Sequence, residues 1–362
     1  MKPVIKAKTP ATAAGAPANA SKGQIKRINV ALQGGGAHGA FSWGVLERLL
    51  EDERIEFEAV SGTSAGAMNA VVMAEGLVEG GRARAKAQLG EFWKAVSDAL
   101  MQTQLPHNPW AGFFPSWTNE MNPALAVFQA MASTASPYQF NPLDYNPLRD
   151  IVESEVDFDR VHQCQSMKLF IAATNVSTGE VEVFTGERVT LDSVMASACL
   201  PTLYKAVEID GVPYWDGGYV ANPVLTPFLT ECEAQDLLIV QVNPRRRVGT
   251  PYTSHDILDR LNEITFNASL VREIGAIQFV NWHLRNGGLR HSGYREVFLH
   301  RIGGGANAEG WTAASKLDGS WDFLTHLRDQ GRAEAETWLV KHFDDIGVRD
   351  TMDGDVIGGG AV

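Results

Sequence analysis

A serine between glycines at the end of a predicted strand is the first candidate for chemistry. The segment FEAVSGTSAG places Ser64 in a G-x-S-x-G pattern, after an apolar run and before a helical one. A sharp strand-to-helix turn exposes the hydroxyl, Gly62 and Gly66 relieve crowding, and the helix N-terminus stabilises nearby negative charge. The same pattern also suits Ser64 as a plain N-cap of the following helix. A nucleophilic serine and a structural serine both fit.

A glycine-rich turn one strand earlier offers backbone N–H groups for an anion. It follows the apolar run INVALQ and precedes another helical pattern. Such a loop can cradle a pyrophosphate, donate to the oxyanion of a tetrahedral intermediate, or form a packing turn. A dinucleotide site needs an acid at the end of the next strand, yet Glu58 lies early in it. The residues of this candidate oxyanion loop are Gly34, Gly35, Gly36, Ala37, His38 and Gly39.

An aspartate at the end of a later strand is the candidate base. Asp216 follows the segment VPYW and precedes Gly217 and Gly218. An acidic side chain at a strand end can reach a serine at the same edge of the sheet. The alternative is a turn aspartate that bonds its own backbone, as we expect for Asp210. The sequence pattern leaves both roles open.

The histidines downstream of Asp216 do not sit where a Ser-His-Asp triad would need one, in a short loop directly after a strand. His300, near the end of EVFLHRI, comes nearest to that position. Without a histidine, the Asp216 carboxylate itself must take the proton from Ser64, which requires burial to raise its pKa. A Ser–Asp dyad is therefore the alternative to a triad through His300.

Alternating strands and helices must hold these candidates at one edge of a sheet. Short apolar runs predict strands, and apolar side chains at three- and four-residue spacing predict helices. This alternation is typical of an α/β fold with a central, mostly parallel sheet and helices on both faces. We expect strands at 28–33, 57–62, 168–176, 180–186, 206–215 (a hairpin that turns at an Asp-Gly pair), 236–243 and 296–302, and helices at 41–50, 65–76, 82–103, 254–285 and 320–345.

Residues 104–145 interrupt this alternation with prolines and aromatic side chains. Prolines preclude a long helix, so we expect a loop-rich aromatic insertion. Its Trp and Phe side chains can contact acyl chains or a bilayer surface, and they can equally be packed inside the fold. The insertion is the candidate for substrate and peripheral membrane contact.

The composition is that of a globular protein with a net charge of −12. This acidic balance argues against a nucleic-acid partner, because such binding depends on neutralising phosphates. The scattered Cys164, Cys199 and Cys232 fit free thiols in a reducing compartment better than disulfides or a zinc site. With no apolar run near the roughly 18 residues of a membrane span, we expect a cytoplasmic protein. Residues 1–25 should form an inert, disordered basic arm, and residues 351–362 a flexible tail.

Four blocks in a fixed order resemble the patatin-like phospholipase family. They are GGGAHG at 34–39, GTSAG at 62–66, ASACLP at 196–201 and DGG at 216–218, within a core of residues 28–226. The resemblance implies a three-layer α/β/α domain over residues 26–350, with 227–350 as a C-terminal helical extension. It also implies that Ser64 is the nucleophile, Asp216 the base and the glycine-rich loop the oxyanion hole, without a metal or other cofactor.

The reaction implied by this resemblance is hydrolysis of lipid acyl esters through an acyl-serine intermediate. An esterase or thioesterase acting on small soluble acyl esters is one alternative, and a non-catalytic lipid-binding or regulatory protein is another. One departure concerns His38, because many family members carry Arg or Lys there. A neutral imidazole would weaken a preference for anionic head groups, so we expect this position to tune substrate charge.

Overall fold

The computed structural model describes residues 25–103, 135–247, 249–289, 293–303, 311–312 and 315–352. The predicted basic arm and flexible tail lie almost entirely outside these ranges. Of the expected aromatic insertion, residues 135–145 are described and contain the short helix α4 (Pro137–Phe140). The predicted contacts of residues 104–134 therefore also lie outside the described part of the chain.

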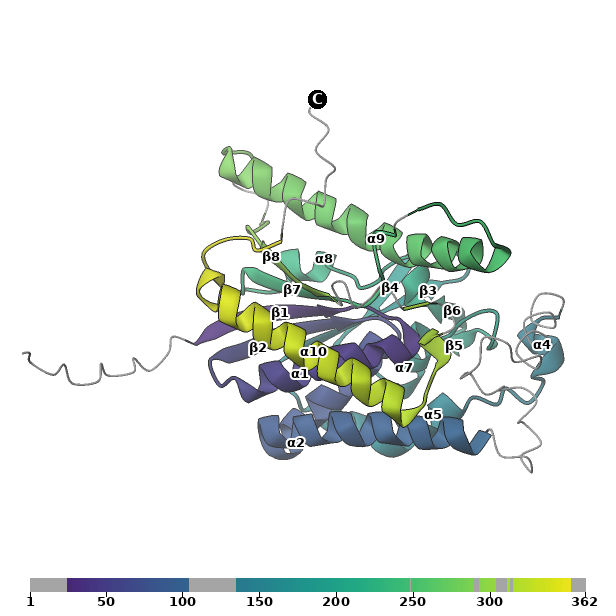
Figure 1. The fold of residues 1–362 in the computed structure, drawn as a ribbon. Coiled ribbons are helices and arrows are strands. Elements are labelled where there is room, and N and C mark those ends of the chain that lie inside the picture. Colours follow the sequence, from purple (N-terminus) through teal and green to yellow (C-terminus); the bar gives the residue numbers. More distant parts are fainter. Residues whose placement is uncertain are drawn as a thin grey trace, which may run out of the picture.

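In the described part of the chain, a single sheet of eight strands forms the centre of the fold (Figure 1). The strand order is β5-β6-β3-β2-β1-β7-β8, and β4 pairs separately with β3. The neighbours from β3 to β8 along this order are parallel, whereas β3–β4, β3–β6 and β5–β6 are antiparallel. The strands are β1 (Lys26–Leu32), β2 (Ile55–Gly62), β3 (Lys168–Asn175), β4 (Val181–Phe184), β5 (Val207–Ile209), β6 (Val212–Asp216), β7 (Asp236–Gln241) and β8 (Phe298–Gly303).

Helices cover both faces of this sheet, which confirms the expected three-layer α/β/α fold (Figure 1). One layer contains α8 (Thr226–Thr230) and α9 (Ser254–Arg285), and the other contains α1 (Gly39–Glu51), α2 (Ala65–Thr103), α5 (Pro147–Glu155), α7 (Leu191–Ser197) and α10 (Trp321–His342). Strand side chains alternate between the layers, because Val30 and Leu32 join the larger core and Ala31 the smaller. The short helix α6 (Phe158–His162) follows α5 in the chain.

The C-terminal third of the chain is more than a helical extension. Besides α9 and α10, residues 227–350 supply β7 and β8, and β7 pairs directly with β1. The apolar segment DLLIVQ explains this placement, because all six residues of β7 are buried. Residues 227–350 therefore complete the sheet that the motif-bearing core begins.

The local predictions agree with the structure except at short helices. The two helices predicted at 65–76 and 82–103 are confirmed, because α2 consists of two helical segments that meet at a kink, where Gly80 and Gly81 have non-helical backbone angles. The short helices α5 and α6 were not predicted, because each is under ten residues long. The predicted hairpin is confirmed, since Asp210 and Gly211 both have positive φ between β5 and β6. No described helix is long and apolar enough to cross a membrane.

Candidate active site

Ser64 lies in the tight turn between β2 and α2. Its φ is 55°, in the left-handed region, which costs a non-glycine residue about 1–2 kcal/mol. The Gly66 N–H donates to the Thr63 carbonyl over 2.9 Å, and a Cβ at Gly66 would collide with the Leu32 carbonyl. The turn is thus held close to the end of β1, with a strained serine at its tip.

The backbone of Ser64 has a second support, from the ASACLP block. Ser197, at the C-terminus of α7, is fully buried, and its hydroxyl accepts a hydrogen bond from the Ser64 N–H over 2.9 Å. The sequence indicated the block through the family resemblance but gave Ser197 no role. Its partner could not be found from spacing, because the two serines are 133 residues apart.

Asp216 ends β6 and is 1% exposed. Its Oδ1 accepts the Gly218 N–H at 2.7 Å, which is the turn-capping role that the sequence left open. Its Oδ2 is buried without a hydrogen-bond partner of ordinary geometry among the described residues. One carboxylate oxygen therefore fixes the turn, and the other remains available as an acceptor.

The environment of Asp216 favours a group that titrates near neutral pH. Burial raises the pKa of Asp216 to about 7, against the lowering effects of the Gly218 N–H, the Ser64 hydroxyl and the Lys316 charge. The Ser64 side chain is therefore near enough to influence the pKa of the carboxylate, although no hydrogen bond of ordinary geometry joins the two side chains. The structure thus brings the two residues of the predicted dyad together.

The glycine-rich loop packs directly on the Ser64 turn. A Cβ at Gly34 would lie 2.7 Å from the Thr63 carbonyl and 2.8 Å from the Ser64 Cβ, so only glycine fits. The Gly34 N–H donates to Asn222 Oδ1 at 2.7 Å, and the His38 N–H donates to the Gly35 carbonyl. These two amides are thus unavailable to a substrate.

Further along the loop, two residues lie at the cavity. Gly36 (φ 57°) and Ala37 lie in the short helix η1 (Gly36–His38) and line the same cavity as Ser64. The Gly39 N–H turns back to the carbonyls of that short helix, and Gly39 begins α1. The loop therefore presents Gly36 and Ala37 as the candidate oxyanion donors.

Buried amide side chains hold the loop in place. Asn243 donates to the Gly34 carbonyl at 2.7 Å, and Asn222 contacts both the amide and the carbonyl of Gly34. The Gln33 side chain accepts the N–H groups of Val242 and Asn243. The sequence did not reveal this network. The one available signal was that the side-chain amides of Gln33, Asn222 and Asn243 come soon after the ends of β1, β6 and β7.

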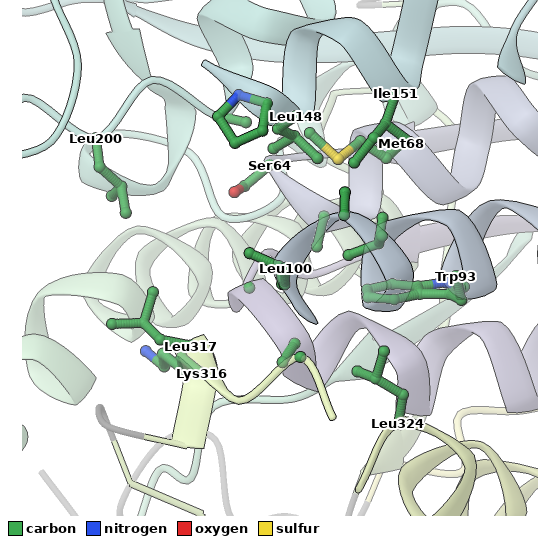
Figure 2. A pocket seen from close by; sticks show the side chains of 18 of the residues that line it. Ser64, Met68, Trp93, Leu100, Leu148, Ile151, Leu200, Lys316, Leu317 and Leu324 are labelled. Atoms are coloured by element: carbon green, nitrogen blue, oxygen red, sulfur yellow. The ribbon is translucent and has the colours of Figure 1, made fainter. Parts of the chain in front are cut away.

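An apolar cavity of about 180 Å³ opens beside Ser64 (Figure 2). Figure 2 shows the Ser64 hydroxyl and the Lys316 ammonium on one side, with Trp93 and Ile151 on the opposite side. Its walls come from α2, α5, the segment after α7, and the region from η5 (Ser315–Leu317) to α10. Apart from a few polar groups beside the serine, the lining suits a hydrocarbon chain.

The histidines singled out from the sequence have other partners. His38 is buried against Trp311, and its Nε2 lies 2.8 Å from the Ser315 hydroxyl. Burial lowers the pKa of His38 well below its usual value, and the charges of Lys316 and Arg247 lower it further. His300, in β8, uses both ring nitrogens, on Asp236 at 2.9 Å and Thr351 at 2.8 Å. Neither imidazole lines the cavity at Ser64.

Lys316 is a cavity residue that no sequence motif indicated. Its Nζ donates to Asn262 Oδ1 at 2.6 Å and lies 4.9 Å from the centroid of the Phe266 ring. Burial lowers the pKa of Lys316 to about 8, and the nearby carboxylates, including Asp216, oppose this shift. Within the described part of the chain, no cluster of three or more His, Cys, Asp and Glu side chains is arranged to hold a metal ion.

The fold and this site define a three-layer α/β/α protein with a serine at a strand-to-helix turn and a buried aspartate beside it. The family model for patatin-like phospholipases matches residues 30–229. The chain therefore belongs to the patatin-like phospholipase family. A comparison with curated proteins found no significant match.

Several solved structures are similar to this chain over most of its length. VipD from Legionella pneumophila is 16% identical, with a TM-score of 0.34, over 84% of this chain and 67% of VipD. Full-length ExoU from Pseudomonas aeruginosa, in complex with SpcU, is 14% identical with a TM-score of 0.29. That match covers 87% of this chain and 53% of ExoU, so the present chain corresponds to about half of ExoU.

Proposed function

We propose that this protein is a lipid acyl hydrolase that cleaves carboxylic esters with Ser64 as nucleophile and Asp216 as base. The observation that carries the proposal is the buried Asp216 carboxylate, whose Oδ2 lacks a hydrogen-bond partner among the described residues while the Ser64 hydroxyl acts on it. A base that titrates near pH 7 suits proton transfer at neutral pH. The membership of the patatin-like phospholipase family supports the same chemistry.

In the first step, Ser64 Oγ attacks the ester carbonyl carbon while its proton moves to Asp216 Oδ2. The carbonyl oxygen becomes an oxyanion that the N–H groups of Gly36 and Ala37 stabilise. A single such donor is worth about 10²–10³ in rate. When the intermediate collapses, the alcohol leaves with the proton from Asp216, and the acyl group remains on Ser64.

In the second step, water attacks the acyl-serine. Asp216 takes a proton from the water, the oxyanion forms again, and Ser64 recovers its proton as the fatty acid leaves. The same base thus acts in both halves of the reaction. Ser197 keeps the Ser64 turn in place throughout, because its hydroxyl accepts the Ser64 N–H.

The cavity favours lipid acyl chains over small soluble esters. Met68, Phe92 and Ile151 lie within its apolar lining, so binding removes hydrocarbon surface from water. Each buried methylene contributes about 0.8 kcal/mol, and kcat/KM should therefore rise with acyl length until the cavity is full. A flat dependence on chain length would instead favour the esterase or thioesterase alternative.

We also propose one catalytic domain over residues 26–350, because β7 and β8 complete the sheet that carries Ser64. A cytoplasmic location, with peripheral contact between residues 104–145 and lipid, is proposed as well. The free thiols of Cys164, Cys199 and Cys232 fit a reducing compartment.

The test is a panel of phospholipids, acylglycerols and p-nitrophenyl esters assayed with the wild type, Ser64→Ala and Asp216→Asn. We expect both variants to be folded and to lose at least about 10³-fold in kcat. Asp210→Asn is the matched control, because Asp210 lies in an exposed Asp-Gly turn next to β6. Turnover retained by Ser64→Ala would overturn the proposal, and an inert but lipid-binding wild type would favour the non-catalytic alternative.

A further inference from the structure

Lys316 places a cation inside an otherwise apolar cavity, and the proposed reaction assigns it no role. The cavity contains Ser64 at the same side as the Lys316 ammonium (Figure 2). Lysine is among the residues least often buried, because desolvating an ammonium is costly. A lysine in this position therefore requires a physical explanation.

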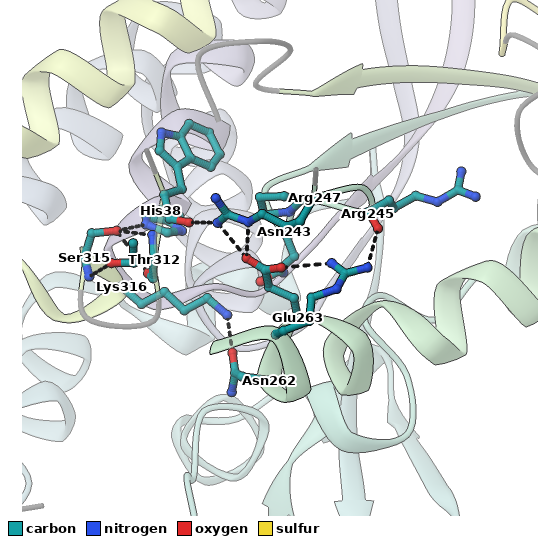
Figure 3. A network of polar contacts seen from close by, with 12 residues as sticks. His38, Asn243, Arg245, Arg247, Asn262, Glu263, Thr312, Ser315 and Lys316 are labelled. Atoms are coloured by element: carbon teal, nitrogen blue, oxygen red, sulfur yellow. Dashed lines mark hydrogen bonds and ion pairs between the residues drawn. The ribbon is translucent and has the colours of Figure 1, made fainter. Parts of the chain in front are cut away.

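The segment that carries Lys316 is tied firmly to the glycine-rich loop. The Ser315 hydroxyl lies 2.8 Å from His38 Nε2 and accepts the Thr312 N–H at 2.9 Å (Figure 3). A Cβ at Gly36 would collide with the Lys316 carbonyl, so the two backbones are in close contact. His38 thus has a positioning role, because it holds the residue next to Lys316 against the oxyanion loop.

The ammonium is only partly satisfied by its surroundings. It has three N–H donors, and the described residues offer one hydrogen-bond acceptor, Asn262 Oδ1, together with the face of Phe266. The residue keeps some solvent exposure, yet burial is the largest influence on its pKa, which falls to about 8. Donors that a ligand can use therefore remain at the cavity.

The Lys316 ammonium faces the cavity, although other charged side chains lie near it. Glu263, a buried acid of α9 that acts electrostatically on Lys316, is already bound by Arg247 at 2.6 Å (Figure 3) and by Arg260 at 2.9 Å. The carboxylates of Asp216 and Asp259 raise the pKa of Lys316 and so favour its charged form. The charges of Arg247 and Lys316 both lower the pKa of His38. Lys316 lines the cavity, whereas Glu263, Asp216, Asp259, Arg247 and His38 do not.

We propose that Lys316 binds the phosphate of a glycerophospholipid or lysophospholipid whose acyl ester lies at Ser64. Resting on the proposed function, this assigns the lipid's hydrocarbon tail to the apolar walls and its phosphate to the polar side of the cavity. A lysine ammonium is a common phosphate ligand. Lys316 would then supply a positive charge that His38 does not, because burial and the nearby cations lower the pKa of His38 well below its usual value.

The test compares two substrates that differ only in the phosphate, 1-decanoylglycerol 3-phosphate and 1-decanoylglycerol. For each we measure kcat and KM with the wild type, Lys316→Met and Lys316→Arg. Because a hydrogen bond to a charged group is strong, Lys316→Met should lower the phosphate preference, the ratio of the two kcat/KM values, by about 10- to 100-fold, mainly through KM. Lys316→Arg, which keeps the charge, should retain most of that preference.

Lys341→Met is the matched control, because Lys341 is exposed on α10 and the same charge is removed. It should leave the phosphate preference within about twofold of the wild type. An equal loss of kcat/KM on both substrates in Lys316→Met would overturn the proposal, since it would show that Lys316 acts only through Asp216.

A binding measurement separates this proposal from the proposed reaction. In the Ser64→Ala background, calorimetry with decyl phosphate and decanol should show that Lys316→Met weakens binding of the phosphate alone by about tenfold or more. Unchanged decyl phosphate binding would contradict the proposal even if the wild type proved to be an esterase. Inorganic phosphate that competes as strongly as decyl phosphate would identify a free-phosphate site and also overturn it.

Discussion

The buried carboxylate of Asp216 should destabilise the fold at neutral and higher pH, and Asp216→Asn should reverse this effect. Burial raises the pKa of Asp216 from 3.8 to about 7. Between these values the native state holds a proton that the unfolded chain releases, so the free energy of unfolding falls as the pH rises. Asparagine keeps the shape and can still accept the Gly218 N–H, but it cannot ionise.

The size of the effect follows from the shift. A difference of about three pKa units corresponds to roughly 4 kcal/mol at 1.36 kcal/mol per unit. About 3 kcal/mol of this should develop between pH 5 and pH 8.5, because the unfolded carboxyl is already ionised at pH 5. The stability of Asp216→Asn relative to the wild type should therefore increase by about that amount over this range and level off above pH 8.

Urea unfolding, followed by circular dichroism at half-unit steps of pH, measures this difference directly. Asp210→Asn is the control, because an exposed turn aspartate should give a difference that does not vary with pH. In parallel, kcat/KM of the wild type should rise through a midpoint near pH 7 as the base loses its proton. A stability difference for Asp216→Asn that stays flat from pH 5 to 8.5 would refute the reasoning that burial keeps this carboxyl protonated.

Three further changes test the construction of the site. Gly34→Ala should lower kcat at least about 100-fold by forcing the loop away from Ser64, whereas Gly275→Ala in α9, where nothing lies within 4 Å, should keep activity and stabilise by about 0.5–1 kcal/mol. Ser197→Ala leaves the Ser64 N–H without its acceptor and should cost about 1–3 kcal/mol in urea unfolding together with a lower kcat. Met68→Trp narrows the cavity, so kcat/KM for decanoyl esters should fall relative to butyryl esters, and an unchanged ratio would place the acyl chain elsewhere.

The short-range features of the site could be predicted from the sequence because strand ends and turn residues lie close together along the chain. Ser64 and Asp216 each follow a clear apolar run. The strand that Asp216 ends is nevertheless antiparallel to β3, and its pairing with Ala173, near the C-terminal end of β3, is what brings Asp216 to the Ser64 side of the sheet. The two roles weighed for Asp216 are compatible in the structure, since Oδ1 caps the turn while Oδ2 stays free for a proton.

The long-range features could not be predicted because they depend on contacts between distant segments. Lys316 has no motif around it, and its place is set by Ser315 against His38 and by Asn262 on α9. The Gly34 N–H cannot serve as an oxyanion donor because it donates to Asn222, which is 188 residues away in the chain. In a single sequence, such partners appear only as isolated polar residues after strands or helices, so their pairing cannot be recognised.

The most direct test of the central claim is the mass of the intact protein after reaction with a fluorophosphonate, followed by peptide mapping. A serine activated by a neighbouring base should add one phosphonyl group per chain, located on the peptide that contains Ser64. The Ser64→Ala variant should add none, and Asp216→Asn should react much more slowly than Asp210→Asn. A full adduct in Ser64→Ala, or labelling at another residue, would contradict the account.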